Sequence, residues 1–544
     1  MDSPMAEGGD GVTLPRLNEC YDSCRALRSE VSRWLAQSRR MDGPGPNGGG
    51  EDEANYALTW FPHYLVTGEE EVVAHMQSLL GALAQWVARE CLHGYEPEAE
   101  AHHGSEPFLL FLPRYLGLFP EDTVAASLLE DAAHHIGNWV AGIPAWYDYE
   151  RDCFYSFYLG TRVVSRDPRF AYEVAEHMRF LHIALAAYRS TRAERYLDWA
   201  LRYGRKRTER ILAAGDGPMP LLWDQAGRGL READLRTDSQ ANLGASGHHV
   251  PGDPLAGIEN LLASGAIYAL GDLYALSRDA LFQQAARRIV EPLVDQLLDP
   301  YGDPGAAAVG YYRRAFQDTS LDGRIRARLD QMPPEPAGRL AMVFPEEHRR
   351  REPGVGKRSD MVYWGIWSED GSVQPIREPS TAALTLAYQI SGDPCYAARA
   401  LRGAATRLMM ARRVLRGGRE HADMGGAVCS VAAGHGRNWG QGAVTGCYGP
   451  LLLGTWEAQG ATVPAIEVRD GAGRARLPEE VLSLVIPPVA GAGEAVFYNG
   501  GSEPVPLSWR GYGQAGGWQE IVLPAGASVR ARFQDRRPTT PLWI

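Results

Sequence analysis

Asparagine, histidine, tyrosine and arginine residues lie close together in two segments near the middle of the sequence, DSQANLGASGHHVPGDP and VGYYRRAF. These are the side chains that β-elimination on a uronic acid needs. The C5 proton beside an ionised carboxylate becomes removable only when hydrogen-bond donors and positive charge neutralise that carboxylate. A tyrosine, with a pKa of about 10, needs cationic neighbours to act as a base. The predicted roles are base and acid for Tyr311 or Tyr312 together with His249, and charge neutralisation for Asn242, His248 and Arg313.

Two histidines and a glutamate open an apolar segment nearer the N-terminus, EAHHGSEPFLLFLP. Glu106 stands immediately before Pro107, which is typical of the first turn of a helix, where the helix dipole also favours an acidic side chain. His102 and His103 would then lie at the mouth of that helix. Substrate binding and simple helix capping both remain open for these three residues.

Aromatic and acidic residues occur together in PAWYDYERDCFYSFYLGT. Trp146 and Tyr147 are candidates for stacking on sugar rings. Asp148 is the best single candidate for the acid of a hydrolase, which needs two carboxyl groups around the glycosidic bond. The i, i+3 spacing of Tyr155 and Tyr158 predicts a helix in the same segment, with these two rings more typical of core packing.

A glycine-rich segment near the C-terminal third, REHADMGGAVCSVAAGHGRNWGQGAVTGCYG, contains further polar and aromatic residues. Glycine lets the backbone approach a ligand closely, so we predict substrate contacts here. His421, Asp423 and His435 could also bind a metal, but their spacing fits no standard zinc pattern, and no metal is predicted. The predicted substrate-binding residues of this segment are His421, His435, Asn438 and Trp439.

Six similar junctions recur between positions 64 and 400. In each, an apolar segment that usually ends in an aromatic residue or leucine is followed by a short run of Ser, Thr, Gly, Pro and acidic residues, and then by an amphipathic segment. This pattern is typical of one helix ending and the next beginning at a capping residue, so we predict six helical hairpins in series, which suggests a closed ring. The junctions are YLVTGEEEVVAHM (64–76), LGLFPEDTVAASLL (116–129), VVSRDPRFAYEVAEHM (163–178), YRSTRAERYLDWA (188–200), YALSRDALFQQAA (274–286) and YQISGDPCYAARA (388–400).

With these hairpins, residues 51–457 resemble the (α/α)6-toroid carbohydrate-active enzymes, most of all the polysaccharide lyases of the chondroitin, hyaluronate and alginate lyase type. The resemblance rests on the number of hairpins and on the chemistry of the junctions. It implies a double ring of helices with a glycan cleft at one end, an acidic polysaccharide or oligosaccharide as partner, and cleavage by β-elimination. Lyases of this type use Asn, His, Tyr and Arg in that order along the chain, which is the order of the two middle segments.

Two alternatives remain open. A glycoside hydrolase of the inverting or unsaturated-uronyl type, on the same fold, would use carboxyl groups, for which Asp148, Glu106 and Asp423 are candidates. A non-catalytic glycan-binding or helical scaffold protein would need only the repeats. Against the scaffold, long irregular insertions such as 213–256 and 300–380 separate the hairpins, and loops of this length are uncommon unless they are functional.

The sequence changes in character near position 458. Beyond it, short alternating runs bounded by Gly, Pro and Asn-Gly predict antiparallel strands and tight turns. At the other end, a helix is predicted near 17–39, followed by RMDGPGPNGGGEDEA, which cannot pack and is typical of a flexible linker. We therefore predict an N-terminal helix and Gly-rich linker (1–50), a toroid domain (51–457) and a β-sandwich-like domain (458–544).

Composition narrows the possible partners. The 544 residues include 55 Lys and Arg against 67 Asp and Glu, a net charge of −12, which argues against a nucleic-acid-binding surface. No apolar run approaches the roughly 18 residues of a membrane span, and the acidic N-terminus does not resemble an export signal, so we expect a cytoplasmic protein without a membrane partner. Motifs for nucleotide, serine-hydrolase and zinc-protease chemistry are absent, so no cofactor is predicted. The oligomeric state stays open.

Overall fold

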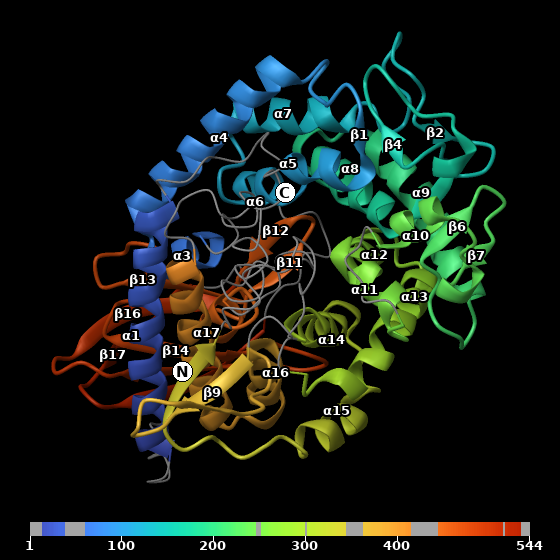
Figure 1. Ribbon diagram of the computed structural model, residues 1–544. Helices are drawn as coiled ribbons and strands as arrows, with labels where there is room; N and C mark the ends of the chain where they lie inside the picture. The colour runs from blue at the N-terminus through green and yellow to red at the C-terminus, as the bar shows by residue number, and fades with distance from the viewer. Residues whose placement is uncertain are drawn as a thin grey trace.

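The computed structural model describes residues 13–38, 60–245, 252–299, 302–343, 363–414, 444–514 and 517–534. Most of this chain is helical, and its helices surround a common centre (Figure 1). A smaller β-region follows at the C-terminal end of the described chain. The prediction of a mainly α fold with a small antiparallel β-region is therefore confirmed.

In the described part of the chain, six pairs of helices follow one another around the ring. Neighbouring pairs contact each other, and α1 (Thr13–Ser38) and the short α19 (Tyr448–Leu452) join the last pair to the first, so that the ring closes. Five of these pairs pack as hairpins. The exception is α14 with α15, because α15 packs against α16 and against the 3-10 helix Pro292–Gln296. The pairs are α3 (Trp60–Thr67) with α4 (Glu70–Glu90), α5 and α6 (Ala101–Leu109, Phe111–Leu118) with α7 (Thr123–Ala133), α8 (Arg179–Thr191) with α9 (Glu194–Ala213), α11 and α12 (Ala256–Ala263, Ala266–Ser277) with α13 (Ala280–Val290), α14 (Asp303–Phe316) with α15 (Asp322–Leu329), and α16 (Thr381–Ser391) with α17 (Pro394–Val414).

One short sequence motif builds four of the junctions between paired helices. A tyrosine carbonyl accepts a hydrogen bond from the N–H four residues later, at Gly68, Arg192, Arg278 or Gly392, and each of these residues is left-handed, with φ of 62°, 59°, 60° and 75°. The Ser or Thr immediately before the left-handed residue accepts a hydrogen bond from the N–H immediately after it, at 3.1–3.3 Å. A left-handed residue ends a helix, and the hydroxyl satisfies a backbone donor at the start of the next one. The local sequence therefore sets where the chain turns back.

One predicted junction, at 163–178, is wrong. Asp167 caps a short 3-10 turn there, because its carboxylate accepts the N–H of Arg169. Further on, the buried Glu173 accepts the N–H of Phe154, which holds the chain extended. The sixth pair is α14 with α15, whose connection lacks the tyrosine motif. The segment forms a 3-10 turn (Pro168–Phe170), β5 (Tyr172–Val174) and a 3-10 helix (Ala175–Met178).

Short antiparallel strands and one further helix, α10 (Asp238–Ala245), lie in the connections between helix pairs. The helix predicted from Tyr155 and Tyr158 is not formed, because this stretch passes from one short strand to another. None of the described helices combines the length and the apolarity that crossing a membrane requires. The strands are β1 (Ala99–Glu100) with β4 (Tyr158–Leu159), β2 (Tyr147–Asp148) with β3 (Cys153–Phe154), β5 with β6 (Leu222–Asp224) and β7 (Gly229–Leu230), and β8 (Arg339–Val343) with β9 (Tyr363–Trp367) and β10 (Val373–Pro375).

The C-terminal β-region consists of two antiparallel three-stranded sheets. The buried Trp509 of one sheet packs against Phe497 and Phe533 of the other, with ring centroids 5.4 and 6.3 Å apart. The two sheets therefore share a small aromatic core. One sheet contains β13 (Ile466–Asp470), β16 (Val505–Gly511) and β17 (Gln519–Leu523), and the other contains β14 (Val481–Ile486), β15 (Gly493–Asn499) and β18 (Ser528–Phe533).

A β-hairpin that precedes this region lies inside the ring of helices (Figure 1). Its turn residues Gln459 and Gly460 are both left-handed, with φ of 49° and 74°, as a tight two-residue hairpin requires. The carbonyl of Gln459 accepts a hydrogen bond from Arg189, and its N–H donates to Asp272 at 2.7 Å. These bonds attach the hairpin to α8 and α12. The strands of the hairpin are β11 (Trp456–Ala458) and β12 (Ala461–Val463).

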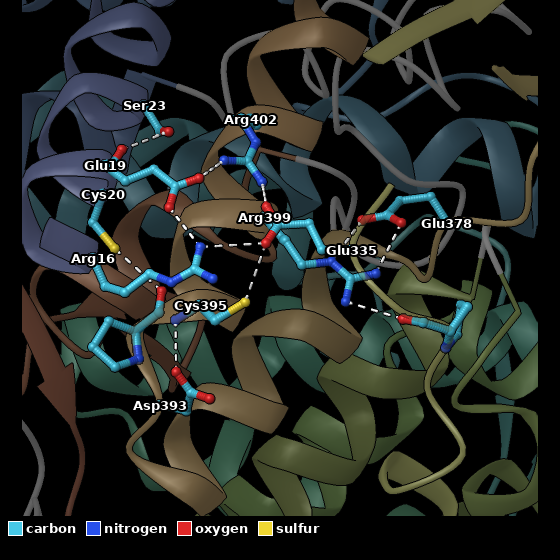
Figure 2. A network of polar contacts seen from close by, with 12 residues as sticks. Arg16, Glu19, Cys20, Ser23, Glu335, Glu378, Asp393, Cys395, Arg399 and Arg402 are labelled. Carbon is cyan, nitrogen blue, oxygen red and sulfur yellow. Dashed lines mark hydrogen bonds and ion pairs between the residues drawn. The ribbon is translucent and has the colours of Figure 1, made fainter. Parts of the chain in front are cut away.

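Helix α1 is fixed to the outside of the ring by a network of charged side chains on α17 and its neighbours. Figure 2 shows Arg402 of α17 between Glu19 of α1 and Glu335, with which it forms ion pairs. One turn earlier on α17, Arg399 binds both carboxylate oxygens of Glu378, at 3.0 and 2.9 Å. The network therefore ties the N-terminal helix to the last helix pair.

The Asp272 carboxyl gives a test of the hairpin's position. Burial raises its pKa to about 7, against about 3.9 in an unfolded chain. Its contribution to stability is therefore fully present below about pH 4 and is lost as the pH rises through about 7. We predict that Asp272→Asn, which keeps an oxygen for the Gln459 N–H, gains up to about 4 kcal/mol in free energy of unfolding relative to wild type between pH 4 and pH 8. Urea unfolding across this range measures it, and a difference that does not change with pH would contradict it.

Candidate active site

The inner helices of neighbouring pairs begin at the same end of the ring. Arg179, the first residue of α8, donates a hydrogen bond to the carbonyl of His102, near the start of α5, at 3.1 Å. It also donates to the Ala263 carbonyl at 3.3 Å, three residues before α12 begins. Asp303, the first residue of α14, accepts a hydrogen bond from the hydroxyl of Thr381, the first residue of α16, at 2.6 Å. Helix N-termini carry partial positive charge and unpaired N–H groups. This end of the ring therefore favours acidic side chains and anionic ligands.

A buried cluster of His102, Glu106, Glu176 and Arg179 lies at this end, and each of these residues is at most 3% exposed. His102 and Glu106 are four residues apart on α5, which places both on one helix face. The Nε2 atom of His102 lies 2.9 Å from Oε1 of Glu106, and Arg179 donates to the same oxygen at 2.9 Å. On the other side of the imidazole, the Nδ1 atom of His102 lies 4.0 Å from Oε1 of Glu176. One imidazole thus stands between two buried carboxylates from different elements.

His103 continues the cluster toward solvent. Its Nδ1 atom lies 3.2 Å from Oε2 of Glu100, and the hydrogen bond between them is the main cause that lowers the pKa of Glu100. Ligand atoms of His102, His103 and Glu106 lie within 4.8 Å of one another, a spacing that a divalent cation could bridge. Arg179 already binds the same oxygen of Glu106, so its positive charge would repel such a cation.

Trp146 and Tyr147 belong to the core, so they cannot stack on a sugar. Both are at most 1% exposed. The indole N–H of Trp146 donates to the Gly160 carbonyl at 3.0 Å, and its ring centroid lies 4.7 Å from that of Tyr95. Tyr147 packs edge-on against Trp199, with centroids 5.6 Å apart.

The Asp148 carboxylate holds a turn together. It accepts hydrogen bonds from the N–H of Glu150 at 2.9 Å and from the guanidinium of Arg151 at 2.7 Å. Burial alone would raise the pKa of Asp148, but these hydrogen bonds outweigh burial and hold the pKa below its ordinary value. A carboxyl group that stays ionised is unsuited to the proton-donating role expected for it.

The tyrosines of α14 do not have the lowered pKa that the sequence suggested. Burial raises the pKa of Tyr311 well above its ordinary value, and its hydroxyl donates to the Tyr268 carbonyl at 3.3 Å. Burial and a 2.5 Å hydrogen bond to Asp318 likewise raise the pKa of Tyr312. Arg313 binds both oxygens of Asp322, at 2.6 and 2.7 Å, so its charge is already compensated. The expectation that neighbouring arginines activate a tyrosine base is wrong for these residues.

The remaining predicted residues are either exposed or outside the described chain. Asn242 is exposed on α10, which packs against β6 and the 3-10 turn Pro168–Phe170. The predicted catalytic residues His248 and His249 lie outside the described residues and stay predictions. The same holds for the predicted substrate contacts His421, His435, Asn438 and Trp439, and for Asp423.

Glu176 and Arg179 are functional candidates that the sequence analysis missed. Both lie at the end of the falsely predicted junction, in AEHMRFLHIALAA, where the charged residues precede an apolar helix. Charged side chains at the border of a fully apolar segment are a signal that could have found them, because such groups are buried only with a partner. Their partners, His102 and Glu106, lie more than 70 residues away.

Comparisons with known proteins leave the family open. No family model matches the chain, and no curated protein matches its sequence. A solved structure that resembles it in part is an unsaturated glucuronyl hydrolase specific for heparin, with 13% sequence identity and a TM-score of 0.36 over 57% of this chain and 82% of the other. A likeness of this size carries no conclusion about the activity of the present chain.

The ion pair between Glu106 and Arg179 makes a prediction about stability. Arg179→Met leaves a buried carboxylate without its guanidinium, which should lower the free energy of unfolding by about 3–5 kcal/mol. Adding Glu106→Gln removes the uncompensated charge and should recover a substantial part of that loss. The control, Arg195→Met, breaks an exposed pair with Glu130 and should cost less than about 1 kcal/mol. Urea unfolding measures wild type, the double variant and the single variants Arg179→Met, Glu106→Gln and Arg195→Met, and strictly additive losses in the double variant would contradict the pairing.

Proposed function

We propose that this protein is a carbohydrate-active enzyme that cleaves a uronic-acid-containing glycan by hydrolysis at the end of the ring where the inner helices begin. The observation that carries the proposal is the imidazole of His102 between two buried carboxylates, those of Glu106 and Glu176. Hydrolysis of a glycosidic bond uses two carboxyl groups. The resemblance of the six-hairpin sequence to toroid enzymes supplies the substrate class.

The surroundings of the two carboxylates support different roles for them. Glu106 accepts from Arg179 and stands against His102, so it is fixed as an acceptor, which suits a general base. Glu176 comes from a separate element and faces the opposite nitrogen of His102; we assign it as the proton donor. The positive helix N-termini favour the approach of an anionic sugar.

β-Elimination is the second candidate. It is favoured by one observation, that Tyr311 and Arg313 line the same cavity beside Arg314. The raised pKa of Tyr311 opposes its action as a base at neutral pH. A non-catalytic glycan-binding protein is the third possibility and would need no carboxylate pair.

One assay separates these functions. The protein is incubated with a panel of acidic polysaccharides and with oligosaccharides that carry an unsaturated terminal uronic acid. Reducing ends and the ultraviolet absorbance of the C4=C5 double bond are followed in parallel. We expect new reducing ends without a rise in absorbance. A rise in absorbance together with reducing ends would establish elimination, and the absence of both signals on every substrate would favour the binding protein.

Variants of the two carboxylates test their roles. Glu106→Gln and Glu176→Gln should each lower kcat by about 100-fold or more, the usual contribution of a positioned acid or base. Glu378→Gln is the matched control, because Glu378 is also buried and paired with an arginine but lies in the network of Figure 2. The control should keep wild-type kcat. Equal losses in all three variants would show a general effect on folding and contradict the assignment.

A further inference from the structure

A cavity of about 320 Å³ lies between α14 and α16 and extends to β11 and to the loop that follows β14. None of the residues that line it belongs to α5 or α8, which carry the cluster of His102, Glu106 and Arg179. Its volume falls at the lower end of the range found for small-molecule pockets, which is about 300–1,000 Å³. The cavity is thus a separate site, large enough for a small molecule.

An aromatic and cationic wall forms one side of this cavity. The guanidinium carbon of Arg314 lies 4.4 Å from the centre of the Trp456 ring, and the same guanidinium donates to the Gly454 carbonyl at 2.6 Å. The rings of Tyr268 and Tyr311, with centroids 4.6 Å apart, continue the wall. Aromatic faces beside fixed hydrogen-bond donors suit a ligand with both apolar and polar faces, such as a sugar ring.

The charged side chains that line the cavity carry a net positive charge. Asp322 is held by Arg313 at 2.6 Å, so these two charges compensate each other. Glu457 is held in the same way by Arg114, at 3.0 Å. Arg326 of α15 is exposed, and within the described part of the chain no carboxylate lies within ion-pair distance of it. The site therefore favours an anion.

A glycine in the middle of α14 keeps the cavity open. Gly310 lines it, and a Cβ atom at this position would meet only Leu386, at an ordinary contact distance of 3.8 Å. Glycine in a helix interior is destabilising relative to alanine, and neither a positive φ nor close packing requires it here. Glycine at position 310 therefore keeps part of the cavity empty and is not needed for the fold of the helix.

We infer that this cavity binds a small sugar acid, of one or two sugar units with a free carboxylate. The carboxylate lies toward the exposed Arg326, and the sugar ring lies against Trp456. The inference does not depend on the proposed function, because binding here needs neither Glu106 nor Glu176.

Isothermal titration calorimetry of the full chain with D-glucuronic acid tests this inference, with D-glucose as the neutral match. Glucuronic acid should bind, and glucose should bind at least tenfold more weakly. Arg326→Gln, at an exposed position, should weaken glucuronic acid binding roughly tenfold, the effect of one charge-assisted hydrogen bond. Gly310→Leu fills the cavity and should abolish binding. Gly305→Ala is the control on the same helix, because its Cβ meets Leu293 at 3.5 Å outside the cavity, and it should bind as wild type.

The variant Gly310→Leu distinguishes this cavity from the end of the ring, because it alters the cavity and leaves the end of the ring unchanged. Its loss of binding, with full binding in Gly305→Ala, places the ligand in the cavity. No binding by the wild-type chain would overturn the inference, and so would unchanged affinity in Arg326→Gln. Full binding in Gly310→Leu would place the ligand outside the cavity and overturn it as well.

Discussion

Ion pairs between buried carboxylates and arginines of neighbouring helix pairs hold the ring of helices together. Removing a charge from water costs several kcal/mol unless a partner compensates it. Glu106 of α5 meets Arg179 of α8, and Asp303 of α14 meets Arg407 of α17 at 2.6 Å. Each pair joins two different helix pairs, so an ion pair forms only when neighbouring helices are in register. The charges therefore fix where the inner helices begin relative to one another.

Ion pairs between buried carboxylates and arginines also position side chains inside the ring of helices. At the end where the helices begin, Arg179 orders Glu106 beside His102. Deeper in the ring, Arg114 holds Glu457 of the inserted hairpin. The hairpin packs against α6 and α12 and contributes a wall to the cavity between α14 and α16. In each of these two regions a buried acid, Glu106 or Glu457, is held by the arginine that it meets.

Much of the fold could be predicted because its signals are local. Four junctions carry a tyrosine, a hydroxyl residue and a left-handed residue within five positions, and the structure shows the bonds that this spacing makes. The site was harder to predict, because its bonds join residues far apart in the sequence. His102 and Glu106 were recognised as candidates, but the predicted first turn at Glu106 and Pro107 is wrong, because α5 already begins at Ala101 and contains Pro107. Arg179 was missed because only the folded ring brings it to α5. Trp146 was misread because an aromatic run looks the same whether it lines a cleft or fills a core.

The central claim is that a glycan is cleaved at the end of the ring where His102 stands between Glu106 and Glu176. A crystal structure of the Glu176→Gln variant with an acidic oligosaccharide tests it most directly, because the variant should bind the sugar without cleaving it. The account predicts a glycosidic oxygen within hydrogen-bond distance of the side chain at position 176, with Glu106 near the anomeric carbon. An oligosaccharide that binds elsewhere, with no sugar atom near either side chain, would contradict the account.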